Sequence, residues 1–456
     1  MKHFFHRFRR LHFVGINGTG MCGIAELLLR YGFKITGSDL VDNEVSARLR
    51  KLGAEVAVGH AAENVKDADL VIYSSACKPD NVELLEAKKN DIPVISRAEM
   101  LGELMRLQLG IAVAGAHGKS TTSSMLGTAL KAGGLDPTII VGGRLQSAGG
   151  HSEAGESEWL VAEADEYDRS FLHLMPVHAI LTNLEHEHID TYPTYAEMED
   201  AFVQFANRVP FYGSLVICGD DPGLQAIKPR FKRTVVTYGL NETNRVRAVD
   251  IEYDAGITNA TILDNNETLG TLALRIPGVH NLRNALAVIA MCRRIGVLFE
   301  PVAHALKEFR GVGRRYEIVG VKNGITFVDD YAHHPTEVAA TIAAARSIHS
   351  GRIVAVFQPH LFTRTARFYE QFALALAGAD VVFVADVYPS REQPTAGITG
   401  MLVSDAMRRN GHKIVNDLPL TGRVEAIRSV LKPGDLVVGL GAGDITKTIH
   451  GLVKEQ

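Results

Sequence analysis

The residues best suited to chemistry stand in a glycine-rich turn between an apolar segment, IAVA, and a helix-forming segment. The turn reads Gly115-Ala116-His117-Gly118-Lys119-Ser120-Thr121. In such a turn, backbone N–H groups bind phosphate oxygens, a lysine reaches the outer phosphates, and a hydroxyl faces Mg²⁺. Val113 stands where a strict loop of this type has glycine, so the loop is a variant. The pattern predicts an ATP phosphate site; the alternative is a plain helix N-terminus with a chance lysine.

A second glycine turn, GINGTGMCG, follows the apolar segment LHFV near the N-terminus. Gly18, Gly20 and Gly23 have the spacing G-x-G-x-x-G, and Asp39 ends the next apolar segment. This spacing lets the backbone approach a diphosphate at a helix N-terminus. The motif alone leaves three interpretations open: NAD(P), another diphosphate ligand, or a purely structural turn.

Acidic residues and histidines follow two further apolar segments, at the positions where open α/β sheets bind ligands. Glu163, Asp165 and Glu166 follow WLVA, and TNLEHEHID brings His188 after HAIL. Carboxylates are the usual protein ligands of Mg²⁺. For His188 alone a solvated or core histidine is the competing interpretation, because imidazole suits Mn²⁺ or Zn²⁺ better than Mg²⁺.

Towards the C-terminus, the segments VDDYAHHP and FQPHLFTRT each follow an apolar run. His360 and Arg364 in the second segment could face an anionic substrate, and a solvated loop is the alternative.

The elements that position these motifs are strands alternating with helices. We expect a strand over Leu11–Val14 and helices over Gly23–Tyr31 and Asn81–Asn90. Residues 234–276 are rich in strand and turn residues and predict an antiparallel hairpin at an edge. With 456 residues, the chain is predicted to form three α/β domains with parallel sheets, at 1–107, 108–312 and 313–456.

Composition excludes several classes of protein. Hydrophobic residues make up 46% of the chain, which excludes disorder as its main state. A net charge of −4 argues against a nucleic-acid partner. The four cysteines are widely spaced, which argues against a disulfide framework or a structural zinc site and favours a reducing, cytoplasmic location. Apolar runs fall short of the roughly 18 residues of a membrane span, so no membrane insertion is expected.

Taken together, nine segments resemble the Mur ligases in order and spacing: GINGTGMCGIAE, AGAHGKSTT, VAEADEYDRSFL, TNLEHEHIDTY, GVHNLRNALA, GVGRRYE, VDDYAHHPTEV, FQPHLFTRT and GLGAGD. The resemblance covers nearly the whole chain. It implies an N-terminal Rossmann-like domain for a UDP-sugar, a central P-loop-type ATPase domain, and a C-terminal Rossmann-like domain for the incoming amino acid. It also implies that the first glycine turn binds a UDP diphosphate rather than NAD.

The resemblance further implies roles for individual residues. Lys119 would stabilise the transferring phosphoryl group, Ser120 and Glu163 would hold one Mg²⁺ (or Mn²⁺), and His188 would hold a second. The remaining ATP contacts would be Gly115, Ala116, His117, Gly118, Thr121, His280, Asn281, Arg315 and Asp330. The UDP-sugar contacts would be Gly15, Asn17, Gly18, Thr19, Gly20, Met21, Asp39, Ser74 and Ser75. His333, His360 and Arg364 would face the amino acid and the acyl phosphate.

Two features favour the family members that add L-alanine to UDP-N-acetylmuramate. No lysine occurs between Asp190 and Ile227, where other amino-acid-adding members typically carry a carbamylated lysine. No insertion follows EADEYD, unlike the recycling ligase that adds a tripeptide, which stays the alternative beside an NAD-dependent oxidoreductase. Ala116 and Ser120 replace threonines usual in the family, and Leu361 replaces an arginine, which puts the contacts to the alanine carboxylate in question.

Overall fold

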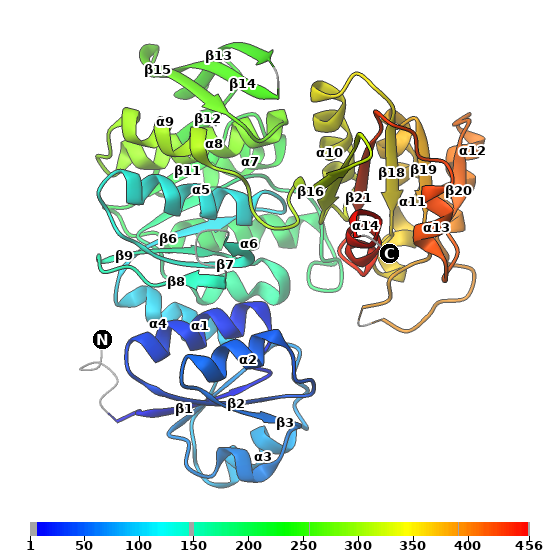
Figure 1. Cartoon of the computed structure of the whole chain (residues 1–456). Coiled ribbons are helices and arrows are strands. Elements are labelled where there is room, and N and C mark those ends of the chain that lie inside the picture. The colour runs from blue at the N-terminus through cyan, green and yellow to red at the C-terminus, as the bar shows by residue number, and fades with distance from the viewer. Residues whose placement is uncertain (1–6, 146–149, 255, 391, 455–456) are drawn as a thin grey trace. The chain divides into compact units, whose positions relative to one another are not determined.

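Three sheets, each flanked by helices, make up the part of the chain that the structure describes, residues 7–145, 150–254, 256–390 and 392–454 (Figure 1). The structure is a computed structural model. It has two compact units, one holding the residues up to Val249 and the other those from Lys307 onward, while the segment between them contributes to both.

The N-terminal sheet is parallel throughout, with the strand order β3-β2-β1-β4-β5. Its strands are β1 (Arg10–Val14), β2 (Lys34–Asp39), β3 (Glu55–Val58), β4 (Leu70–Tyr73) and β5 (Val94–Ser96). Its helices are α1 (Thr19–Arg30), α2 (Glu44–Lys51), α3 (Val82–Lys89) and α4 (Arg97–Arg106). Figure 1 shows α1 and α2 on one side of this sheet and α3 on the other. The glycine turn follows β1, and Asp39 ends β2. Since the two strands are parallel neighbours, both lie at the carboxyl edge of this sheet.

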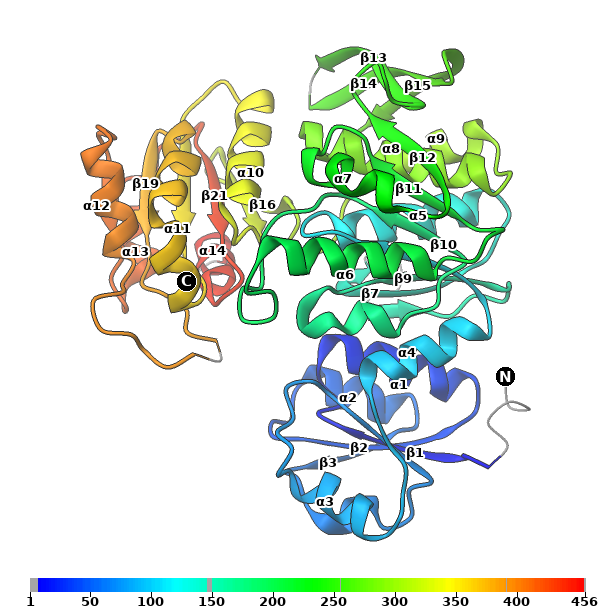
Figure 2. The ribbon, with the colours of Figure 1, turned by 180° about the vertical axis from the view of Figure 1, so that it is seen from behind.

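The central sheet has the order β15-β14-β13-β12-β11-β10-β6-β9-β7-β8. Its strands are β6 (Leu109–Ala114), β7 (Thr138–Leu145), β8 (Gly150–Glu153), β9 (Trp159–Glu163), β10 (His178–Leu181), β11 (Ser214–Cys218), β12 (Thr234–Gly239), β13 (Val246–Asp254), β14 (Ile257–Asp264) and β15 (Glu267–Leu274). Its helices are α5 (Lys119–Ala132), α6 (Tyr195–Arg208), α7 (Pro222–Ile227), α8 (Val279–Arg294) and α9 (Phe299–Glu308). Figure 2 shows α6 and α7 on the face opposite to α5 and α8. Strands β10, β6 and β9 are parallel neighbours, so the segments that follow them meet at one edge.

The C-terminal sheet has the order β16-β17-β21-β18-β19-β20, and only β16 runs antiparallel to its neighbour. The strands are β16 (Glu317–Lys322), β17 (Ile325–Asp330), β18 (Ile353–Phe357), β19 (Val381–Val384), β20 (Val415–Asp417) and β21 (Leu436–Leu440). The helices are α10 (Pro335–Ile348), α11 (Phe362–Ala375), α12 (Met401–Arg409), α13 (Arg423–Arg428) and α14 (Ile445–Val453). Alternate strand residues pack into two cores, one under α10, α11 and α12 and one under α13 and α14.

Several sequence-based expectations can be compared directly with these elements. Residues 234–276 form β12 to β15 at one edge of the central sheet, but β12 pairs in parallel with β11 and with β13, so it is not part of an antiparallel hairpin. All four cysteines are free thiols; Cys22, Cys218 and Cys292 are buried, and Cys77 is half-buried. None of the helices in the described part of the chain is long and apolar enough to cross a membrane.

Candidate active site

The loop between β6 and α5 is held in place by the residue that follows β10. Thr182 donates its backbone N–H to the carbonyl oxygen of Ala114 (3.0 Å) and its hydroxyl to that of His117 (2.6 Å). Gly115 has a φ of +137°, and a Cβ on it would lie 2.0 Å from the Thr182 hydroxyl oxygen. Both the backbone conformation and the close approach therefore require glycine at the start of the loop.

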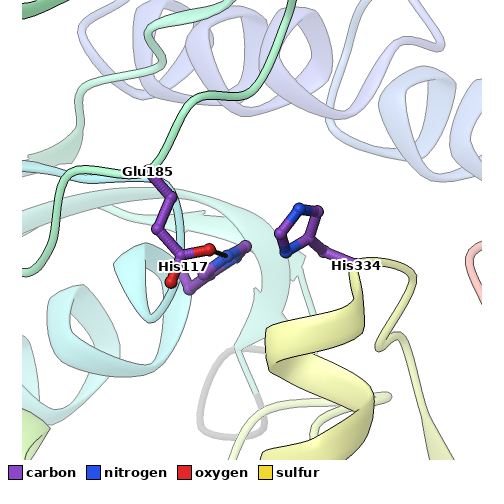
Figure 3. Close-up of side chains that lie close together, drawn as sticks. All are labelled: His117, Glu185 and His334. Atoms are coloured by element: carbon purple, nitrogen blue, oxygen red, sulfur yellow. Dashed lines mark hydrogen bonds and ion pairs between the residues drawn. The ribbon is translucent and has the colours of Figure 1, made fainter. Parts of the chain in front are cut away.

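The next residue along, Asn183, fixes the middle of the same loop. Its side-chain oxygen accepts the backbone N–H of His117 (2.9 Å), and its side-chain nitrogen donates to the His117 carbonyl oxygen (3.0 Å). The His117 ring contacts Glu185, with 3.2 Å between Nε2 and a carboxylate oxygen (Figure 3). Side chains of Thr182, Asn183 and Glu185, from the segment that follows β10, thus contact the loop.

Gly118, with φ of +83°, is the N-cap of α5, and no side chain caps the helix there. The N–H groups of the first helical turn have no intrahelical acceptor and suit an anion. A Cβ on Gly118 would lie 2.8 Å from the side-chain oxygen of Asn284 in α8, so this position too needs glycine. Ser120 and Thr121, in the first turn of α5, are buried at 8% and 7% exposure.

The Lys119 ammonium group contacts two loop carbonyls and one carboxylate. Its ammonium nitrogen lies 2.7 Å from the Gly115 carbonyl oxygen, 3.2 Å from that of Ala116, and 2.8 Å and 3.0 Å from the two carboxylate oxygens of Glu166. Burial alone would lower the pKa of Lys119, but the carboxylates of Glu166 and Asp165 outweigh burial and raise it. Lys119 is therefore a fixed positive charge at the loop.

Glu166 joins the lysine to a cluster that suits a divalent cation. Its carboxylate lies 3.4 Å from the Nε2 atom of His188, which is itself 3.8 Å from a carboxylate oxygen of Glu187. One ligand atom from each of these three residues lies within 4.8 Å of the others. Although burial would raise the pKa of Glu166, Lys119 and His188 hold it well below its usual range, so the carboxylate is ionised. Two carboxylates and an imidazole fit Mg²⁺ or Mn²⁺ in donor type.

The family resemblance assigns His188 to a metal, whereas neither it nor the motif pattern singles out Glu166 or Glu187. Glu163, the predicted acid, is the last residue of β9 and approaches Gly142 of β7, where a Cβ would lie 3.0 Å from its carboxylate oxygen. Glu163, Asp165 and Glu166 are so close in the sequence that their spacing does not show which carboxylate contacts Lys119. That distinction depends on the turn after β9, which only the structure supplies.

At the N-terminal glycine turn, the end of β2 holds three successive backbone N–H groups. The Ser38 carbonyl oxygen accepts from Gly15 (2.9 Å) and Ile16 (3.1 Å). The Asp39 carboxylate accepts from Asn17 (2.9 Å). Gly15, Asn17 and Asp39, three of the residues that the resemblance assigns to the UDP-sugar, thus lie together. One carboxylate oxygen of Asp39 therefore accepts a hydrogen bond from the loop itself.

The other predicted UDP-sugar residues surround this turn. The Ser74 Cβ lies 3.2 Å from the position of a Cβ on Gly15, and Ser75 beside it is exposed. Gly20 lies against the Arg97 side chain of α4, with 2.8 Å between a Cβ position and the guanidinium, so sequence reasoning missed a cation at this loop. Met21 is buried at 1% exposure. Gly18 is the N-cap of α1, and the side chain of Thr19 lies outside the described residues.

In the C-terminal domain, the predicted residues form two groups. The Asp330 carboxylate accepts the backbone N–H groups of Tyr316 and Ala332, each at 2.8 Å, and burial raises its pKa to about 6. The Arg315 guanidinium lies over the Tyr331 ring, 5.1 Å from its centroid. Asp330 thus holds the backbone amide that follows Arg315 and the one that follows Tyr331.

The second group consists of rings. The His333 and His360 ring centroids are 5.9 Å apart, and His360 stacks on Tyr388 at 5.8 Å. Arg364 lies in the first turn of α11, half-buried. His280 and Asn281, at the start of α8, belong to the same compact unit as the C-terminal domain, and Asn281 donates its side-chain N–H to the Pro277 carbonyl oxygen (2.7 Å).

The observed fold is a three-sheet α/β protein with a glycine- and lysine-bearing loop at a helix N-terminus in its central sheet. Three family models match the chain in succession: "Mur ligase family, catalytic domain" over residues 10–109, "Mur ligase middle domain" over 113–292, and "Mur ligase, glutamate ligase domain" over 314–443. The chain therefore belongs to the Mur ligase family.

Individual proteins agree with this assignment. The chain is 45% identical to the UDP-N-acetylmuramate--L-alanine ligase of Geotalea daltonii over 450 residues, which are 98% of each chain. Its structure resembles the UDP-N-acetylmuramate-alanine ligase of Thermotoga maritima, with a TM-score of 0.82 and 30% identity. The match covers 97% of this chain and 98% of the Thermotoga chain. A murein peptide ligase from Psychrobacter arcticus shares the fold, with a TM-score of 0.71, 24% identity and 98% coverage of each chain.

Proposed function

We propose that this chain joins L-alanine to the lactyl carboxylate of UDP-N-acetylmuramate, with conversion of ATP to ADP and phosphate, in peptidoglycan precursor synthesis. The observation that carries the proposal is the full-length likeness, at 45% identity, to ligases named for this reaction. The lysine-bearing phosphate loop supplies the chemical means. The domains are proposed to be residues 1–107 for the UDP-sugar, 108–312 for ATP, and 313–456 for the amino acid.

The chemistry needs activation because a carboxylate is a poor electrophile towards an amine. A carboxylate oxygen attacks the γ-phosphorus, the bond from that phosphorus to the bridging oxygen breaks, and ADP leaves. The alanine nitrogen then attacks the carbonyl carbon of the acyl phosphate and loses its proton, while the C–O bond breaks and phosphate leaves. Catalysis of phosphoryl transfer consists largely of positioning and charge neutralisation.

In the central domain, the loop residues Gly115 to Thr121 cradle the phosphates with their backbone. Lys119 neutralises charge on the transferring group, which requires phosphate oxygens to replace its carbonyl partners. Ser120, Glu163 and His188 would hold the divalent cations, with Glu166 and Glu187 beside His188. A bound Mg²⁺ supplies charge neutralisation on the phosphate oxygens.

In the flanking domains, the glycine turn at Gly15 to Met21 binds the UDP diphosphate, with Asp39, Ser74 and Ser75 nearby. His280 and Asn281 contact adenine, and Arg315 and Asp330 act on ATP from the C-terminal domain. His333, His360 and Arg364 face the amino acid. Leu361 cannot supply a cation, so Arg364 is assigned the alanine carboxylate. We further propose a cytoplasmic location, because the four cysteines are free thiols.

A phosphate-release assay tests the function. Purified protein with ATP, Mg²⁺ and UDP-N-acetylmuramate is given L-alanine, glycine, L-serine or the tripeptide L-alanyl-γ-D-glutamyl-meso-diaminopimelate. We expect the highest kcat/KM with L-alanine. A preference for the tripeptide would assign the chain to the recycling ligases instead. In a separate assay with added NAD(P)H, a change in nicotinamide absorbance without phosphate release would make it an oxidoreductase.

A further inference from the structure

A buried carboxylate lies one layer behind the N-terminal glycine turn, outside the proposed chemistry. Glu83, in the first turn of α3, is 0% exposed. An ionised carboxylate away from water destabilises a fold unless hydrogen bonds compensate it. Here the Ser38 hydroxyl donates to one oxygen (2.5 Å), and the Asn64 side chain (2.6 Å) donates to the other.

Two histidine rings also lie beside the Glu83 carboxylate. The Nδ1 atom of His60 lies 3.2 Å from the carboxylate, and the Nε2 atom of His12 lies 3.6 Å from it. The other ring nitrogen of His12 is 2.8 Å from the Thr36 hydroxyl. Burial would raise the pKa of Glu83, but the neighbouring His12 ring and the hydrogen bonds from Ser38 and Asn64 outweigh it and lower the pKa to about 2. Glu83 is thus an anion at neutral pH.

Ser38 connects this anion to the glycine turn. Its side chain donates to Glu83, while its carbonyl oxygen accepts the N–H groups of Gly15 and Ile16. The next residue, Asp39, accepts the N–H of Asn17. The position of the end of β2 therefore determines where three consecutive loop amides lie.

We propose that Glu83 is a positioning residue for the UDP-sugar, which acts through Ser38 to hold the glycine turn in the shape that accepts a diphosphate. The inference rests on the proposed function, which assigns a UDP diphosphate to this turn. The hydrogen-bond partners of the Glu83 carboxylate include Ser38, His60, Ala61 and Asn64. Of these, Ser38 leads to the loop, so the effect of Glu83 passes through the end of β2. A loop ordered in advance binds its ligand more tightly, because less freedom is lost on binding.

The test compares Ser38→Ala, which removes the hydroxyl that contacts Glu83 and His60, with Glu83→Gln, which removes the charge and keeps the shape. We expect the KM for UDP-N-acetylmuramate to rise about tenfold in each, the change that loss of one hydrogen bond to a charged group produces. The kcat and the KM values for ATP and L-alanine should stay within about twofold of wild type. The double variant should be no worse than Glu83→Gln, because both changes break one link.

Asp69→Ala is the matched control. The Asp69 carboxylate accepts the N–H groups of Arg9 (2.6 Å) and Arg10 (2.8 Å) at the opposite end of β1. Its loss should lower the melting temperature without raising the KM for the UDP-sugar. An unchanged KM in Ser38→Ala, or an equal rise in Asp69→Ala, would overturn the proposal. Ser38→Ala alone decides if Glu83→Gln does not fold. Wild-type protein that releases no phosphate with UDP-N-acetylmuramate would instead overturn the proposed function.

Discussion

At the scale of single residues, the pair of Lys119 and Glu166 dominates the site. An ammonium group has three donors, and here they serve two loop carbonyls and the Glu166 carboxylate. Lys119→Ala removes the cation that is proposed to face the phosphates, so we expect phosphate release to fall at least about a thousandfold. Lys131→Ala, which breaks an ion pair with Glu153 at the far end of α5, should retain activity. Near-normal turnover in Lys119→Ala, with ATP binding measured by calorimetry, would refute this site.

Glu166 should matter beyond its charge, because it contacts both the lysine and His188. Glu166→Gln keeps the shape but weakens both contacts, so we expect kcat to fall at least about tenfold and half-saturation by Mg²⁺ to need more metal. A Mg²⁺ titration of the ligation rate measures both. Glu197→Gln, which changes a surface acid paired with Arg169, should match wild type. If the Mg²⁺ dependence of the ligation rate were identical to that of wild type, Glu166 would have no part in metal binding.

At the scale of elements, local patterns predict most of the fold. The strand expected over Leu11–Val14 is β1, and the helix expected over Asn81–Asn90 is α3 with Asn81 as its N-cap. The helix expected from Gly23 instead begins at Thr19. The first turn of α1 contains glycines of the diphosphate motif. Because glycine is a poor helix former, the sequence pattern does not predict a helix there.

Site residues that are close together in the sequence could be predicted from it, whereas residues brought together by packing could not. The glycine turns are contiguous, so their spacing carries the information. Glu83, by contrast, meets His12, Ser38 and His60 only after β1, β2 and α3 have packed together. No local spacing encodes that meeting.

The packing of α3 against β2 leads to a prediction about pH. The folded-state pKa of Glu83, about 2, lies below its unfolded value, so its stabilising effect is complete above the unfolded pKa and is lost as pH falls through the folded one. We expect Glu83→Gln to have a lower urea midpoint than wild type at pH 7. The difference should shrink steadily between pH 5 and pH 3. Urea titrations at pH 7, 5 and 3 measure it, and a difference that is constant with pH would contradict an ionised Glu83.

At the scale of the whole molecule, the proposed reaction needs groups from separate domains on one nucleotide. The phosphate loop belongs to the central domain, whereas Arg315, Asp330 and His333 belong to the C-terminal one. The segment between the domains contains Gly311, whose φ of +100° suits glycine, and Gly313. We predict that this segment is a hinge, and that closing it excludes water from the acyl phosphate.

Small-angle scattering tests the hinge. The radius of gyration should decrease when a nonhydrolysable ATP analogue and UDP-N-acetylmuramate are bound together, and by less with either ligand alone. Replacing Gly311 by alanine imposes strain at a positive φ, so this variant should shift the balance between open and closed forms and lower kcat more than it changes either KM. If the radius stays constant while calorimetry finds both ligands bound, Gly311 and Gly313 shape a static turn, and the C-terminal residues must reach the nucleotide without domain closure.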